Sequence, residues 1–172
     1  VRETELSMLR RIGAPERSIL VTQSNLAITY GALGQIDRAL QLERGVYHGS
    51  LRLLGEEDED TLISANNYAD SLLKLERFEE AKSLLRKTFP VTRRVLEEGN
   101  DTTLRLRWNY AKSLYKADGA TLDDLREAVA TLEDAGRIAR RVMGGANPIT
   151  VDIEEELRQA ALAAREGRRE GG

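Results

Sequence analysis

Few residues in this chain could carry out chemistry. Its one histidine is His48, and it has no cysteine, so we expect no nucleophile–histidine pair and no thiolate metal site. The acidic run 56–60 lacks the spacing and the central glycine of a calcium-binding EF-hand loop. The pair Gly144 and Gly145 lacks the Gly-Lys-Ser/Thr ending of a phosphate-binding loop. We therefore predict that the protein is not an enzyme and that it has no metal and no cofactor.

The most regular polar feature is a repeated asparagine. Asn25, Asn67 and Asn109 follow one another at intervals of 42 residues, each inside a similar block of sequence, and Gly13 and Gly55 keep the same interval. Self-similarity at a fixed period is typical of stacked-repeat proteins. Such chains build an extended surface from repeated units, and that surface normally binds something. The spacing therefore predicts a binding protein.

The third interval is longer than the others. Thr61 and Thr103 are 42 residues apart, but Thr103 and Thr150 are 47 apart, so the third unit contains a five-residue insertion around Gly119. We favour a plain longer turn there over a binding loop. In a fourth unit, the position equivalent to the asparagines holds Glu156. This departure fits a terminal repeat, because one face of such a repeat meets water.

Each unit is expected to fold as two helices. In the second unit Ala65, Tyr68, Ala69 and Leu72 recur with the 3.6-residue period of one helix face. No stretch alternates like a strand, so the sequence predicts an all-α protein. The expected helix pairs are 16–33 with 36–54, 58–75 with 78–97, and 101–117 with 121–143, flanked by helices 2–12 and 148–166.

Composition limits the possible partners. Charged residues make up 32% of the chain, yet the net charge is only −3, so we expect no nucleic-acid binding. The longest apolar runs are far short of the ~18–20 residues that a membrane span needs. No signal peptide is visible. We expect a cytoplasmic protein that binds neither nucleic acid nor membrane; its oligomeric state is open.

Several residues carry a resemblance to a known family. The block Asn66 to Ala69, the small residues Ala39 and Ala81, and Gly34 between two helices resemble the tetratricopeptide repeat (TPR). The 42-residue period is similar to that of the kinesin-light-chain type, whose Gly-x-x-His-Pro-x-Thr motif residues 144–150 match except at the histidine. The resemblance implies a right-handed α-solenoid of stacked antiparallel helix pairs that acts as a protein-interaction module.

The resemblance also implies a division of the chain within one solenoid domain. Residues 1–12 would be the second helix of a truncated preceding repeat. Repeats would follow at 13–54, at 55–96 and, with the five-residue insertion, at 97–143. Residues 144–166 would form a capping helix, and the polar residues 167–172 a disordered tail.

In the TPR family the first helices line a concave groove, and the resemblance places peptide-contacting residues around the repeated asparagines. Arg105, Trp108, Lys112 and Lys116 also follow the spacing of one stripe along one helix. A basic stripe with one aromatic residue suits an acidic peptide that carries an apolar anchor. The predicted groove residues are Asn66, Asn67, Asp70, Lys74, Arg105, Trp108, Asn109, Lys112 and Lys116.

Structural roles compete with this interpretation. The asparagines could bond neighbouring helices, since buried amides need partners. Trp108 could be packed between repeats, and Lys112 and Lys116 could pair with Glu155 and Glu156. The whole protein could also be a structural scaffold subunit of a larger assembly, with its helical faces permanently covered. Exposed apolar residues on the second helices would favour that alternative.

Overall fold

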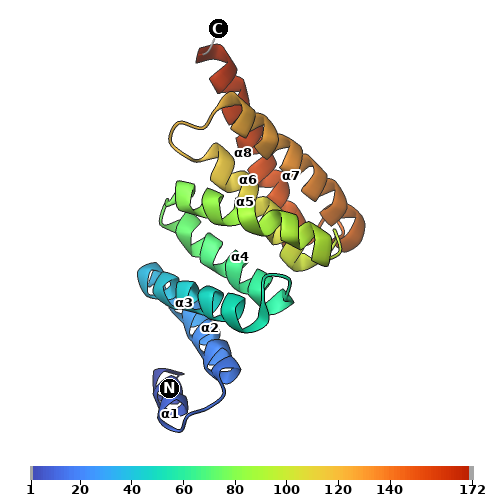
Figure 1. Ribbon diagram of the computed structural model, residues 1–172. Coiled ribbons are helices and arrows are strands. Elements are labelled where there is room, and N and C mark those ends of the chain that lie inside the picture. The colour runs from blue at the N-terminus through green and yellow to red at the C-terminus, as the bar shows by residue number, and fades with distance from the viewer. Residues whose placement is uncertain (1, 171–172) are drawn as a thin grey trace. The chain divides into compact units, whose positions relative to one another are not determined.

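The computed structural model describes residues 2–170, which form eight helices and no strand (Figure 1). The helices belong to two compact units that divide after Glu76. The first unit contains α1 (Arg2–Arg11), α2 (Glu16–Ala32), α3 (Ile36–Leu54) and α4 (Glu59–Lys74). The second contains α5 (Phe78–Val95), α6 (Asp101–Tyr115), α7 (Leu122–Met143) and α8 (Pro148–Glu170). The all-α prediction is confirmed, and the predicted helices lie where the sequence placed them, within a few residues at their ends.

Within each unit, every helix packs against the next one in the chain. In the first unit α2 contacts α1 and α3, and α3 contacts α4. In the second unit α6 packs against α5, α7 and α8, so it has neighbours on three sides (Figure 1). A helix in that position buries most of its surface, which determines how much of α6 a ligand can reach.

Small residues at repeated positions form the centre of each helix pair. Ala27 and Ala69, which occupy equivalent positions of α2 and α4, have no exposed surface, and neither does Ala111 of α6. The second helices contribute Ala39 and Ala81, which are equally buried. A methyl group at these points lets neighbouring helices approach closely, and a larger side chain would overfill the contact.

Glycine closes most of the turns between helices because the backbone there is left-handed. Gly34, between α2 and α3, has a φ of 73°, and Gly119, between α6 and α7, has a φ of 77°. The residue 42 positions after Gly34 is Glu76, which has a φ of 57°. Glu76 thus adopts a conformation that costs little for glycine but roughly 1–2 kcal/mol for a residue with a Cβ atom.

The C-terminal helix is longer than predicted. The predicted disordered tail is wrong as far as Glu170, because α8 continues to that residue. At Gly167 a Cβ atom would lie 3.0 Å from Leu125 Cδ1 of α7, so the end of α8 still has a neighbour to pack against. Residues 171–172 lie outside the described part of the chain.

Candidate functional site

Side-chain caps fix the two helices that carry the main candidate site. The Asn100 side chain accepts a hydrogen bond from the Thr102 backbone N–H at 2.8 Å and begins α6. The Asn147 side chain does the same for Ile149 at 2.9 Å, just before Pro148 begins α8. Both caps stabilise the first turn of the helix that follows.

Glu156 points inward from α8. The buried residues of this helix include Ile149, Ile153, Ala160 and Ala164, and Glu156 falls on the same buried stripe. Only 9% of its side chain is exposed. A carboxylate in such a place needs donors, since burying an unpaired charge is costly.

Four side chains of α6 supply those donors. The Trp108 indole N–H donates to Glu156 Oε2 at 3.1 Å, and the Tyr115 hydroxyl donates to Glu156 Oε1. Lys116 Nζ lies 3.4 Å from the same carboxylate and Lys112 Nζ lies 4.0 Å from it. We call these residues (Trp108, Lys112, Tyr115, Lys116 and Glu156) the Glu156 cluster.

The contacts within the Glu156 cluster keep the carboxyl group ionised. Burial by itself would raise its pKa, but the hydrogen bonds from Tyr115 and Trp108, with the two lysine ammonium groups, hold the pKa of Glu156 below its usual value. Burial and the same hydrogen bond raise the pKa of the Tyr115 phenol, which stays protonated. The cluster is thus a carboxylate held by two neutral donors and two cations.

Three of the four residues of the predicted stripe on α6 contact the same group, and Arg105 does not. Trp108, Lys112 and Lys116 meet at one place, around Glu156. Arg105 pairs instead with Asp101 on its own helix, at 2.8 Å. The sequence also allowed Lys112 and Lys116 to pair with Glu155 and Glu156 of the following helix. This pairing is confirmed for Glu156. Glu155 pairs with Arg158 instead.

Two of the predicted groove residues are buried. Asn66 of α4, which was expected at an exposed position, is buried, so that expectation is wrong. Asn109 is buried in α6, as the alternative of a structural role requires. The buried surface of α4 extends over Ser64 and Ala65 as well as Asn66, which is wider than a single helical stripe. α6 has helices on three sides, so its asparagine faces protein rather than solvent.

The other predicted residues of the first unit lie at the surface of α4. Asn67 and Asp70 are partly buried and Lys74 is exposed. Lys74 Nζ forms an ion pair with Asp70 Oδ2 at 2.7 Å, one helical turn away. Glu43 of α3 lies next to this pair and is buried, with a hydrogen bond from Ser71. Burial raises the pKa of Glu43, which the sequence analysis had not singled out.

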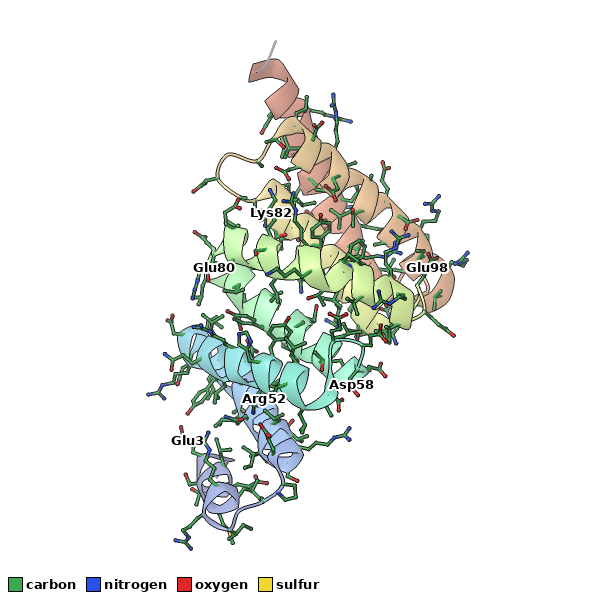
Figure 2. The ribbon with its side chains drawn as sticks, viewed as in Figure 1. Glu3, Arg52, Asp58, Glu80, Lys82 and Glu98 are labelled. Atoms are coloured by element: carbon green, nitrogen blue, oxygen red, sulfur yellow. The ribbon has the colours of Figure 1, made fainter. Side chains whose placement is uncertain are left out.

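Another ion pair joins two second helices. Lys82 of α5, labelled in Figure 2, lies 2.8 Å from Asp124 of α7. Burial alone would raise the pKa of Asp124, but Lys82 and the capping hydroxyl of Thr121 lower it. Both partners are almost fully covered, so this pair holds the second unit together and is not open to a ligand.

The first unit also contains a small apolar cavity of about 90 Å³ between α2, α3 and α4. Leu20, Val46 and Leu54 line it together with Val21 and Ile63. The last two residues are 42 positions apart, on equivalent turns of α2 and α4, and both are exposed. An ion pair between Arg17 and Asp60, at 2.9 Å, lies at the same cavity.

Two residues of the Glu156 cluster were not predicted as site residues. For Glu156 the sequence carries a signal, because the apolar spacing of 149, 153, 160 and 164 places residue 156 on the buried face of its helix. For Tyr115 we find no such signal. Among the described side chains, no three histidines or carboxylates gather closely enough to hold a metal ion.

None of the helices within residues 2–170 combines the length and apolar character that crossing a membrane requires.

The sequence matches a family model described as tetratricopeptide repeat, over residues 19–60 and 61–100. No curated protein sequence gives a match. The division into repeats that begin at residues 13, 55 and 97 stays a prediction, since the matched ranges begin elsewhere.

Solved structures share the fold. Two crystal structures of nearly identical TPR-like repeats of a kinesin-light-chain-like protein from Podosopora anserina superpose with TM-scores of 0.77 and 0.75. Each is 22% identical and covers 98% of this chain, which spans 81% and 78% of those chains. BtubC (BKLC) from P. vanneervenii is 20% identical, with a TM-score of 0.72 over 90% of this chain and 60% of its own. These matches confirm the predicted α-solenoid fold.

Proposed function

We propose that this chain, which matches the tetratricopeptide-repeat model over residues 19–60 and 61–100 and has the fold of kinesin-light-chain-like repeats, binds a short acidic peptide segment along the exposed side of α6. The repeats themselves indicate a protein–protein interaction module. The acidic character of the ligand and its place on α6 are the new elements of the proposal. The predicted residues that contact it are Trp108, Lys112 and Lys116, with Arg105 one turn earlier.

A local excess of positive charge is the main support for an acidic ligand. Lys112 and Lys116 share the single carboxylate of Glu156, so the Glu156 cluster carries two cations and one anion. Their side chains are 28% and 32% exposed, which leaves part of each side chain in contact with solvent. An approaching carboxylate would therefore be attracted to this surface and could pair with both lysines.

The alternative, a scaffold subunit with permanently covered faces, requires a broad apolar surface on the second helices. Among the described side chains of α1, α3, α5 and α7, the exposed large apolar residues are Met8, Leu53, Val95 and Val142. Each lies in the last turn of its helix. Four isolated residues at helix ends do not form a continuous face, so the peptide-binding proposal has the better support.

A binding titration tests the proposal. A fluorescein-labelled peptide of six to eight residues, mostly glutamate and aspartate around one leucine, is titrated with the protein, and fluorescence anisotropy gives Kd. A peptide with glutamine and asparagine in place of the acids is the control. We expect binding of the acidic peptide that weakens as salt rises, because ions screen the attraction.

Substitutions then locate the surface. Lys112→Gln and Lys116→Gln should each weaken binding several-fold, while Lys87→Gln, the same charge change on an exposed position of α5, should not. Trp108→Ala should weaken binding more than either lysine change, provided that its circular dichroism spectrum stays helical. Equal binding of both peptides, or equal effects of all three lysine changes, would contradict the proposal.

A further inference from the structure

The Glu156 cluster has a composition that the other repeats lack. Glu156 occupies the position of the repeated asparagines, 47 residues after Asn109, which itself follows Asn67 by 42. The earlier repeats place a neutral amide there. Only at residue 156 does the chain place a carboxylate, and only there do an indole N–H, a hydroxyl and two ammonium groups converge on it.

We propose that Trp108, Lys112, Tyr115 and Lys116 form a carboxylate-binding site that Glu156 fills from within the chain. In this arrangement Glu156 competes with the acidic side chain of a bound peptide and limits its affinity. The inference rests on the proposed function, since it concerns the same surface of α6. It adds a residue that determines specificity and a chemical class, the carboxylate, that the four donors recognise.

The contact distances show that the lysines are not saturated by Glu156. Lys116 and Lys112 approach it at 3.4 and 4.0 Å, longer than the ~2.7–2.9 Å of a close charge-assisted hydrogen bond. Each ammonium group carries three N–H donors. The Tyr115 hydroxyl has a single hydrogen, for which Glu156 and Gln159 Oε1, at 3.4 Å, are both acceptors. The two lysines are therefore the groups that retain donors for a second carboxylate.

The charge of Glu156 is not what the helix packing requires. The equivalent position accommodates asparagine in three repeats. An amide can accept a hydrogen bond from the indole through its oxygen and donate one to the hydroxyl oxygen through its NH2 group. What the charge adds is repulsion toward any other anion that approaches Lys112 and Lys116. Removing the charge while keeping the acceptor should therefore open the site to a ligand.

The first experiment compares wild type with Glu156→Gln, using the labelled acidic peptide described above. Glu156→Gln can turn its amide oxygen toward the Trp108 indole N–H and its NH2 group toward the Tyr115 hydroxyl oxygen. The change frees both lysines, and we expect about tenfold tighter binding. The matched control is Glu155→Gln, which removes the same charge one residue away and should change Kd less than twofold. If wild type binds the peptide and Glu156→Gln binds it equally or more weakly, the inference is overturned while the proposed function stands.

A second experiment examines the site without a peptide. Trp108 is the only tryptophan in the chain, so its fluorescence reports on this site alone. In Glu156→Ala the missing carboxylate leaves room for acetate, and we expect a saturable change in fluorescence and a rise in Tm with sodium acetate, but not with sodium chloride at equal ionic strength. Wild type should show neither effect.

The two experiments separate the possible failures. If no variant binds the peptide but acetate binds to Glu156→Ala, the proposed function fails and the carboxylate site stands. If acetate acts no differently from chloride, the site is overturned. Should Glu156→Ala be unfolded, restoration of its helical circular dichroism by acetate alone supports the site, and no restoration overturns it.

Discussion

Trp108 of α6 and Glu156 of α8, which are 48 positions apart in the chain, are joined by a hydrogen bond of 3.1 Å. The bond takes the indole N–H away from solvent and gives a buried carboxylate one of its donors. Trp108 therefore has a structural role in the second unit as well as the proposed role in ligand binding, and the two can be separated by substitution.

Trp108→Phe should destabilise the protein by about 1.5–3 kcal/mol, because it removes a hydrogen bond to a charged group while keeping most of the ring. Urea unfolding followed by far-ultraviolet circular dichroism measures the change, since the variant lacks the only tryptophan. A double-mutant cycle with Glu156→Ala, which removes the acceptor, provides the control. If the two effects simply add, the hydrogen bond contributes nothing to stability.

Ala69→Leu should destabilise the first unit by about 1–3 kcal/mol, because Ala69 has no exposed surface and three added carbons would overfill the helix contact. Ala130→Leu, at an exposed position in the middle of α7, is the matched control and should have little effect. Thermal unfolding by circular dichroism gives both values. An unchanged melting temperature for Ala69→Leu would show that the proposed repeat register is wrong.

Glu76→Gly should stabilise the protein by about 1 kcal/mol, because the left-handed backbone at Glu76 is unfavourable for a residue with a Cβ atom. The control is Glu133→Gly, at an exposed site inside α7, where glycine should cost about 1 kcal/mol. Urea unfolding of both variants tests the prediction. The free energy of unfolding should rise in Glu76→Gly and fall in Glu133→Gly. A fall in both variants would contradict the strain at Glu76.

Glu43 should make the protein less stable as pH rises. Burial raises its folded-state pKa, and Asp70 adds to the rise, while Ser71 and Lys74 oppose it. A raised pKa contributes stability that is complete below the unfolded value of about 4.3 and is lost as pH rises through the folded value. Glu43→Gln should therefore have a higher Tm than wild type at pH 8, and the gain should shrink at pH 4.5.

The control for this pH dependence is Glu133→Gln, which removes a carboxylate at an exposed position. Its Tm relative to wild type should change little between pH 4.5 and pH 8. A uniform loss of stability in Glu43→Gln at both pH values would mean that the hydrogen bond to Ser71, and not the cost of ionising a buried acid, determines the behaviour of this site.

Much of the fold could be predicted from the sequence because the same helical spacing of apolar residues recurs in each repeat. The 42-residue interval between Asn25 and Asn67, and the helical spacing around Ala69, placed the helices to within a few residues. The tail beyond residue 166 was misjudged because its polar composition resembles that of a disordered end. Contact between Leu125 and the end of α8 depends on packing, which composition does not report.

The sequence by itself determined the helical pattern of the protein, since period and turn residues are local properties of the chain. It also placed Trp108, Lys112 and Lys116 on one stripe of one helix. Only the tertiary structure decided what faces that stripe. Burial of Asn66 and Asn109, and the arrival of Glu156 beside Trp108, depend on how many neighbours each helix acquires, and a repeat period leaves that number open.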